Sequence, residues 1–298
     1  MERAELVRLG LRLILRRGRR PRLTPQALRR RLECLNRIAP RPPRGIEYIT
    51  VDAGGVSGER IAGPVSRPDR HILFLHGGGY TFGSSLLYRD FTWRIAGACR
   101  ATVLCIDYRL APEHPFPAAL DDTVAAYRWL LGQGADPRHI AVAGDSAGGG
   151  LVFALLLRLR DEGTPLPAAA AVISPWTDLA LTGESLQRDN AKDPVISIDR
   201  AERNAALYLA GADPRAPYAS PLYGDPAGLP PTLFLVGSDE LVLDDSLRMA
   251  DRMRTAGCKV ELDVAPNMFH AWHLFSRLLP QARQTIARIG SFLQSKME

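Results

Sequence analysis

The sequence has few cysteines, no long hydrophobic run and no N-x-S/T glycosylation site. Its four cysteines are Cys34, Cys99, Cys105 and Cys258; they form no C-x-x-C pair and share no metal-ligand spacing with histidine, which excludes a zinc or dithiol redox motif. The longest apolar runs, such as residues 151–157, fall far short of the roughly 18 residues that cross a bilayer. The start of the chain lacks the apolar core and cleavage site of a signal peptide. We therefore expect a cytoplasmic protein with free thiols and no bound metal.

Positive charge is concentrated near the start of the chain. Residues 1–44 hold fourteen Arg against three Glu, whereas the whole chain of 298 residues carries only +6, so the remainder is mildly acidic. Such an arm could bind nucleic acid or an anionic membrane. Leu6, Leu9 and Leu13 recur at helical spacing among these arginines, which favours an amphipathic helix packed on the protein's own surface. We expect no nucleic-acid partner and keep a membrane-surface anchor as the alternative.

Two helices and a break precede the rest of the chain. The second helix is expected to begin with Thr24 as N-cap and Pro25 at its first position. The proline-rich residues 40–45 then interrupt any helix. We therefore divide the chain into a helical cap segment, residues 1–44, and a main domain, residues 45–298.

The main domain alternates short apolar runs with helical patterns. The expected strands cover residues 72–75, 101–106, 139–143, 170–173, 232–236 and 260–264, and the expected helices cover residues 120–133, 147–162, 243–256 and 280–294. Alternation of this kind is typical of an α/β fold with a mostly parallel sheet covered by helices on both faces.

One segment interrupts the alternation. Residues 178–229 contain no strand pattern, many prolines and one helical run near residues 199–209. A connection between strands needs far fewer residues. We interpret the segment as a cap insertion that packs with the N-terminal helices above the carboxyl edge of the sheet, where open α/β sheets bind ligands.

The strongest local signal is the G-x-S-x-G motif Gly144-Asp145-Ser146-Ala147-Gly148, between an expected strand and an apolar helix. A serine at such a turn projects its hydroxyl above the sheet, and Gly144 and Gly148 remove the Cβ atoms that would collide with neighbouring backbone. The second signal is His76-Gly77-Gly78-Gly79-Tyr80, directly after a strand. Consecutive glycines allow backbone N–H groups to converge on the oxyanion of an acyl-transfer reaction. No Gly-Lys-Ser/Thr sequence follows, which excludes a phosphate loop.

These two motifs, together with the segment of residues 107–119, resemble the hormone-sensitive-lipase-like family of carboxylesterases, and the resemblance covers roughly residues 45–298 in the right order. It implies an α/β-hydrolase fold, hydrolysis of short acyl esters with acetyl removal as one candidate task, and a homodimer paired through the sheet edge. It supplies no catalytic role for residues 107–119, which we interpret as scaffold with Asp107 and Glu113 paired to arginine or backbone amides.

A nucleophilic serine needs a histidine base and an acid that orients it, in the chain order Ser, acid, His for this fold. The run Asn267-Met268-Phe269-His270 resembles the family's histidine segment and places His270 as base; His273 is expected on the following helix. The family pattern after the strand 232–236 puts Glu240 in the acid position, one residue after its rival Asp239. Adjacent residues of an extended segment point in opposite directions, so both cannot face His270.

The resulting hypothesis is a serine esterase that needs no cofactor. Ser146 attacks the ester, His270 takes its proton, Glu240 orients His270, and the N–H groups of Gly78, Gly79 and Ala147 bind the oxyanion. The alternative is a ligand-binding homologue on the same fold; the presence of His270 argues against it. Candidates for the lining of an apolar substrate pocket, or equally for the core of the lid, are Leu6, Leu9, Leu13, Phe82, Trp176, Leu207 and Tyr208.

Overall fold

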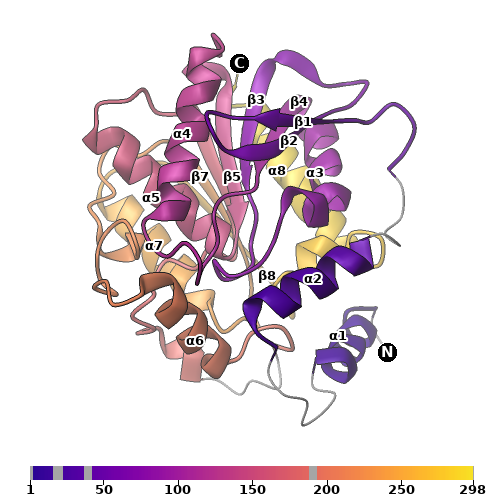
Figure 1. Ribbon diagram of the computed structural model, residues 1–298, viewed down its shortest axis with the longest axis vertical. Helices are drawn as coiled ribbons and strands as arrows, with labels where there is room; N and C mark the ends of the chain where they lie inside the picture. The colour runs from indigo at the N-terminus through magenta and orange to yellow at the C-terminus, as the bar shows by residue number, and fades with distance from the viewer. Residues whose placement is uncertain (1–2, 16–22, 37–41, 188–192, 298) are drawn as a thin grey trace.

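The computed structural model describes residues 3–15, 23–36, 42–187 and 193–297. It contains one sheet of eight strands in the order β1-β2-β4-β3-β5-β6-β7-β8 (Figure 1). The strands are β1 (Glu47–Asp52), β2 (Ser57–Ala62), β3 (Arg67–Leu75), β4 (Ala101–Ile106), β5 (Ile140–Asp145), β6 (Ala169–Ile173), β7 (Thr232–Gly237) and β8 (Val260–Ala265). Pairing is antiparallel between β1 and β2 and between β2 and β4, and parallel from β4 to β8. The expected mostly parallel α/β sheet is therefore confirmed.

All six predicted strands are present, with shifted ends. β3 begins at Arg67 rather than at residue 72, and β5 begins at Ile140 because Pro137–His139 forms a 3₁₀ turn that Asp136 caps. His139 therefore precedes β5 instead of starting it. The sequence analysis missed β1 and β2, whose exposed residues give no continuous apolar run.

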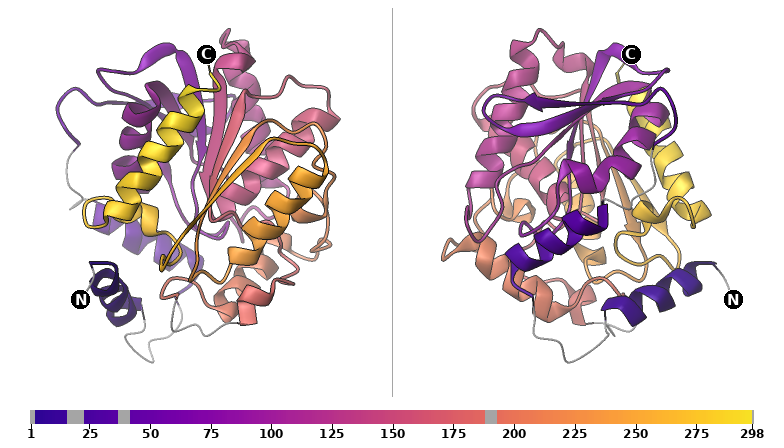
Figure 2. Two further views of the ribbon diagram at one scale, coloured as in Figure 1. Left: turned by 180° about the vertical axis from the view of Figure 1, so that it is seen from behind. Right: turned by 45° about the vertical axis from the view of Figure 1, so that its right-hand side comes forward.

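Helices cover both faces of the sheet (Figure 2). α3 (Ser85–Cys99) and α8 (Pro280–Gln294) lie on one face, and α4 (Ala118–Gly132), α5 (Ala147–Asp161) and α7 (Leu243–Thr255) lie on the other. Alternate residues of β3 serve the two faces: Leu73 and Leu75 join the core beneath α5, whereas Ile72 and Phe74 join the core beneath α3 and α8.

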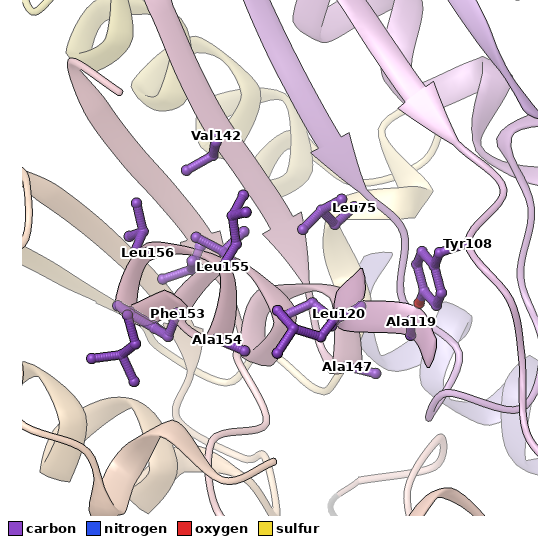
Figure 3. Close-up of a cluster of buried hydrophobic side chains, with 14 of the residues drawn as sticks. Leu75, Tyr108, Ala119, Leu120, Val142, Ala147, Phe153, Ala154, Leu155 and Leu156 are labelled. Atoms are coloured by element: carbon purple, nitrogen blue, oxygen red, sulfur yellow. The ribbon is translucent and has the colours of Figure 1, made fainter. Parts of the chain in front are cut away.

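The core beneath α5 is the larger of the two and holds the site-bearing helix rigidly. In Figure 3, Leu75 and Val142 of the sheet lie over the helical side chains of Phe153 and Leu155. All four side chains are fully buried. Burying a side chain of this size contributes about 1.5–3 kcal/mol, so the turn between β5 and α5 stands on a well-packed base.

Three further helices gather at the carboxyl end of the parallel strands: α1 (Arg3–Leu15), α2 (Pro25–Asn36) and α6 (Ile198–Leu209) (Figures 1 and 2). The predicted start of α2 is confirmed, since Thr24 Oγ1 accepts the N–H of Ala27 at 3.2 Å. Pro40 and Arg41 of the predicted break lie outside the described residues. None of the described helices has the length and apolar character needed to cross a membrane.

The orientation of α1 differs from the expected one. Leu6, Leu9 and Leu13 are 51%, 45% and 59% exposed, whereas Arg8 on the opposite face is only 5% exposed. The inward face of the helix consists of Ala4, Val7 and Leu11 together with Arg8, whose guanidinium donates to a carboxylate and a carbonyl group of the main domain. The leucine stripe is thus neither lid core nor lining of the cavity in front of Ser146.

Candidate active site

Ser146 sits at the sharp turn between β5 and α5. Its backbone has φ 54° and ψ −121°, a strained conformation that the turn imposes. The N–H of Ser146 donates to Ile173 O of β6 at 2.9 Å, and the N–H of Trp176 donates to Ser146 O at 2.9 Å. These bonds hold the turn against the neighbouring strand, so the hydroxyl of Ser146 points out beyond the sheet edge.

The glycines of the G-x-S-x-G motif are required by close backbone approach. A Cβ atom on Gly148 would lie 2.0 Å from Leu75 O, and one on Gly144 would lie 2.6 Å from Gly148 O. Neither carbonyl can move without breaking the sheet or the start of α5. The motif therefore follows from the packing of β5, α5 and the end of β3.

Ser146, His270 and Glu240 form a hydrogen-bonded chain. Ser146 Oγ lies 2.8 Å from His270 Nε2, and His270 Nδ1 lies 2.8 Å from Glu240 Oε2. Glu240 is fully buried, and its other oxygen accepts the hydroxyl of Ser174 at 2.7 Å and the N–H of Gly237 at 2.6 Å. The structure thus brings together three residues from loops after β5, β7 and β8, separated by up to 124 positions in sequence.

The surroundings of His270 favour its protonated form. Burial alone would lower the pKa of this imidazole, but the hydrogen bond and negative charge of Glu240 outweigh it, helped by the carboxylates of Asp193 and Asp145. The net result is a pKa of His270 above its ordinary value. A positive charge that develops on His270 is therefore stabilised in place.

Asp239, the alternative acid, does not approach His270. Its Oδ2 accepts a hydrogen bond from Arg8 at 2.8 Å; in this ion pair the Arg8 side chain is 6% exposed and the Asp239 side chain 12% exposed. The same guanidinium donates to Asn267 O at 2.8 Å. Asp239 thus points toward α1 while Glu240 points toward His270; the two side chains diverge in the turn that follows β7, where the N–H of Glu240 donates to Gly237 O at 3.3 Å.

Asp145 fastens the glycine-rich loop that follows β3. It accepts the N–H of Gly77 and the hydroxyl of Tyr88, each at 2.8 Å. His76, at the start of the loop, is buried and stacks on Tyr108 with ring centroids 4.3 Å apart. Burial lowers the pKa of His76, which keeps it neutral and structural.

The loop leaves no room for side chains at its tip. Gly78 and Gly79 have φ +129° and +58°, and a Cβ atom on Gly78 would lie 1.9 Å from Phe82 O. Among the described residues, the N–H groups of Gly78, Gly79 and Ala147 have no backbone acceptor. Three donors beside Ser146 are therefore free to bind an oxygen that carries negative charge.

The residues 107–119 act as scaffold, as predicted. Asp107 accepts the N–H of Ser85 at 2.6 Å, and Glu113 pairs with Arg29 of α2 at 2.9 Å. Arg29 also donates to the carbonyl oxygens of Thr81 and Ala111. This arginine therefore connects α2 to the loop that carries Gly78 and Gly79.

A cavity of about 260 Å³ opens in front of Ser146 and His270. Phe82 and Trp176 line it, as predicted, whereas Tyr208 is buried against the ring of Tyr80. Other lining residues are Leu11, Val195, Ile196, Arg200, Asn204, Val242, Leu274 and Phe275.

Four residues of this site escaped the sequence analysis: Ser174, Asp193, Arg200 and Asn204. Of these, only Ser174 could have been found from its position, directly after β6 at the carboxyl edge of the sheet.

His273 lies on a 3₁₀ turn, Trp272–Phe275, rather than on α8, and its Nε2 is 3.4 Å from Asp145 Oδ2. In the described ranges no cluster of His, Cys, Asp and Glu could hold a metal ion.

Comparison with known proteins agrees with this geometry. The model of a family with the α/β hydrolase fold matches residues 72–274. An acetyl-hydrolase of Streptomyces hygroscopicus is 47% identical over 232 residues, 78% of each chain. A putative acetyl-hydrolase of Mycobacterium tuberculosis is 36% identical over 285 residues, 94% of this chain and 92% of its own. A solved esterase of the bacterial hormone-sensitive lipase family is similar with a TM-score of 0.95 at 44% identity, covering 100% of this chain and 99% of that one.

Proposed function

Because this chain belongs to the α/β-hydrolase family, among the carboxylic ester hydrolases of the bacterial hormone-sensitive lipase type, we propose that it hydrolyses short acyl esters through Ser146, His270 and Glu240. The observation that carries the proposal is the chain of two 2.8 Å contacts from Ser146 Oγ through His270 to Glu240 Oε2. It has the form that activates a serine nucleophile.

In the first half of the reaction, Ser146 Oγ attacks the ester carbonyl carbon and gives its proton to His270 Nε2. Glu240 holds the Nδ1 side of the ring and stabilises the imidazolium, in line with the raised pKa of His270. The carbonyl oxygen becomes an oxyanion bound by the N–H groups of Gly78, Gly79 and Ala147. Collapse breaks the ester bond, His270 protonates the departing alcohol, and Ser146 carries the acyl group.

In the second half, water enters where the alcohol left. His270 takes a proton from this water, the hydroxide attacks the acyl carbon, and the same N–H groups bind the second oxyanion. His270 then returns the proton to Ser146 Oγ, and the carboxylic acid leaves. Every proton moves through one imidazole, so no metal or organic cofactor is needed.

The size and lining of the cavity support short acyl groups. Its volume of about 260 Å³ lies just below the usual range for small-molecule sites, roughly 300–1,000 Å³. Its walls are mainly apolar. A related crystal structure, 39% identical, was soaked with p-nitrophenyl butyrate. Acetyl and butyryl esters are therefore the substrates we propose, in agreement with the names of the acetyl-hydrolase relatives.

The test is hydrolysis of a p-nitrophenyl ester series from acetate to palmitate, with Ser146→Ala measured in parallel. We expect kcat/KM to be highest for acetate or butyrate and to fall with longer chains, and the variant to lose activity on every ester. An active Ser146→Ala protein would contradict the nucleophile, and wild-type inactivity on all esters would favour the ligand-binding alternative.

Three further expectations belong to the same proposal. We assign residues 1–44 and the insertion of residues 178–229 to a cap over the site, since Leu11 of α1 and Arg200 of α6 both line the cavity. We also propose a reduced, cytoplasmic setting, supported by four free cysteines, and a homodimer paired through the edge of the sheet. Sedimentation of the purified protein tests the dimer.

Contact with a membrane surface is a separate proposal. It is supported by the exposed Leu6, Leu9 and Leu13 and by the arginine excess of residues 1–44. Co-sedimentation with anionic vesicles, compared between wild type and the triple Leu→Ser variant, tests it. Equal binding by both proteins would reject α1 as the contact.

A further inference from the structure

The cavity in front of Ser146 contains a polar feature that ester hydrolysis does not use. Arg200 and Asn204 lie one turn apart on α6 and both line the cavity, whose other cap residues, such as Val195 and Ile196, are apolar. Among the described residues that line it, Arg200 is the only arginine or lysine. A permanent cation in an apolar wall is costly unless an anion accompanies it.

Arg200 has unused hydrogen-bonding capacity. Its Nη1 donates to Val195 O at 3.0 Å, and within the described ranges the structure gives the guanidinium no other acceptor and no carboxylate at ion-pair distance. A guanidinium carries five donors, so most remain available. Burial lowers the pKa of Arg200, with the charge of Arg203 acting in the same direction.

Asp193 is the protein carboxylate that attracts Arg200, but its oxygens are occupied elsewhere. Its Oδ1 accepts the N–H groups of Val195 at 3.0 Å and Ile196 at 3.3 Å, its Oδ2 accepts the N–H of Leu241 at 3.4 Å, and burial raises its pKa. The role of counter-ion to Arg200 is therefore open to a ligand.

Asn204 connects this feature to the reacting centre. It is buried, and the structure assigns its amide no hydrogen-bond partner among the described residues. A Cβ atom on Gly79 would lie 2.3 Å from Asn204 Nδ2, so the amide packs against the loop that binds the oxyanion. Tyr208, one further turn along α6, stacks on Tyr80 with ring centroids 3.8 Å apart. The helix is thus fixed on the loop, and its polar side chains are held in place.

We propose that Arg200, assisted by Asn204, is a subsite for a carboxylate carried by the ester substrate, so that the enzyme prefers esters with an anionic group. A carboxylate matches the planar donor fork of arginine in a two-bond contact. This inference rests on the proposed esterase activity and adds the charge class of its substrate. The anionic group is on the acyl part or on the alcohol part, and the experiment distinguishes the two.

The test uses two pairs of esters whose members differ at one group, a carboxylate in one member and an uncharged group in the other. For the acyl part, mono-p-nitrophenyl succinate is compared with p-nitrophenyl butyrate; for the alcohol part, 4-acetoxybenzoate is compared with 4-acetoxybenzamide. Each is measured with wild type, Arg200→Gln, Arg200→Lys and Arg203→Gln, and the rate with Ser146→Ala is subtracted as background. Arg203 is the matched control because it is exposed on the same helix and does not line the cavity.

We expect Arg200→Gln to raise KM for the anionic member of one pair about tenfold to a hundredfold, as for loss of a hydrogen bond to a charged group. The kcat values for all esters, and the KM values for the neutral esters, should change less than about threefold. Arg200→Lys should recover part of the lost affinity for the anionic ester, and Arg203→Gln should behave as wild type. A raised KM for mono-p-nitrophenyl succinate would place the carboxylate on the acyl part of the substrate, and a raised KM for 4-acetoxybenzoate would place it on the alcohol part.

An equal effect of Arg200→Gln on charged and neutral esters, or no effect in either pair, would overturn the subsite while leaving the esterase proposal intact. Wild-type inactivity on the neutral esters would instead overturn the proposed function itself. Activity of Arg200→Gln on p-nitrophenyl butyrate serves as the check that the variant folds.

Discussion

Arg8 donates a 2.8 Å hydrogen bond to Asp239, the residue directly before Glu240, and a second 2.8 Å bond to Asn267, three residues before His270. One side chain of α1 thus contacts both loops that carry the proposed acid and base, Glu240 and His270. Arg29 of α2 does the same for the loop of Gly78 and Gly79 through Thr81 O. Part of the arginine excess of the N-terminal segment is therefore explained as attachment of the cap to the site.

Because Asp239 pairs with Arg8 and Glu240 pairs with His270, substitution of each carboxylate should have a different effect on activity. Glu240→Gln leaves the imidazole without the carboxylate that fixes its tautomer, so we expect kcat to fall by about 10⁴-fold, as for the equivalent change in other serine hydrolases. Asp239→Asn keeps Glu240 in place and should reduce kcat by less than about tenfold. Steady-state kinetics on p-nitrophenyl butyrate decides between them, and the reverse order would make Asp239 the acid.

Loss of Arg8 should loosen α1. Arg8→Met leaves the carboxylate of Asp239, which is 12% exposed, without its partner. Breaking a fully buried pair typically costs about 3–5 kcal/mol, and this partly buried pair should cost less. Because α1 lies at the edge of the structure, we expect the helix to undock before the main domain unfolds. Faster proteolysis within the first helix, with the melting transition of the main domain nearly unchanged, is the expected result.

The double variant Arg8→Met with Asp239→Leu removes both charges and should recover part of the protection of α1. If the effect of the double substitution on the rate of proteolysis equals the sum of the effects of Arg8→Met and Asp239→Leu alone, the two residues are not coupled. In that case α1 is held by other contacts.

Substitution by alanine should destabilise the protein at Gly148, in the turn after β5, and stabilise it at Gly97, in α3. Gly148→Ala places a Cβ atom 2.0 Å from Leu75 O, so activity and stability should both fall sharply. Gly97→Ala in α3 meets nothing within 4 Å and should stabilise the protein by about 0.5–1 kcal/mol. Denaturant unfolding measures both, and a stable, active Gly148→Ala protein would contradict the tight approach of α5 to β3.

The helices and strands that could be predicted from the sequence are those marked by residues within the element itself. A continuous apolar run identifies a buried parallel strand, and Thr24-Pro25 identifies a helix start. β1 and β2 were missed because half-exposed strands acquire their identity from pairing, of β1 with β2 and of β2 with β4, and these contacts are made only in the fold. The triad candidates stood next to motifs and could be named in advance. Arg200 and Asn204 carry no motif, and only the packing of α6 onto Tyr80 turns them toward Ser146.

The same reasoning explains why α1 was oriented wrongly. Helical periodicity places leucines on the buried face, since burial of apolar surface is the common driving force. Here the buried face combines the apolar Ala4, Val7 and Leu11 with Arg8. The partners of Arg8, Asp239 and Asn267, are more than 230 residues away in sequence. Nothing local to α1 shows that these partners exist.

The pH dependence of kcat/KM should report the surroundings of His270. Only neutral His270 can accept the proton of Ser146, so activity is absent below the pKa of His270 and appears as the pH rises through it. That pKa is raised by Glu240, Asp193 and Asp145 against the opposing effect of burial. We therefore expect the acid limb of the profile to lie above the ordinary histidine value of about 6.5.

Asp193→Asn removes one of these negative charges without touching Ser146, His270 or Glu240, so it should move the acid limb to lower pH while the enzyme remains active. Asp251→Asn on α7 is the matched control: Asp251 is exposed, is not among the charges that act on His270, and should leave the limb in place. A limb that stays in place in Asp193→Asn, or moves equally in Asp251→Asn, would show that Asp193 does not set the proton affinity of His270. A shift confined to Asp193→Asn would mean that the cap insertion, besides lining the cavity, raises the basicity of the residue that activates Ser146.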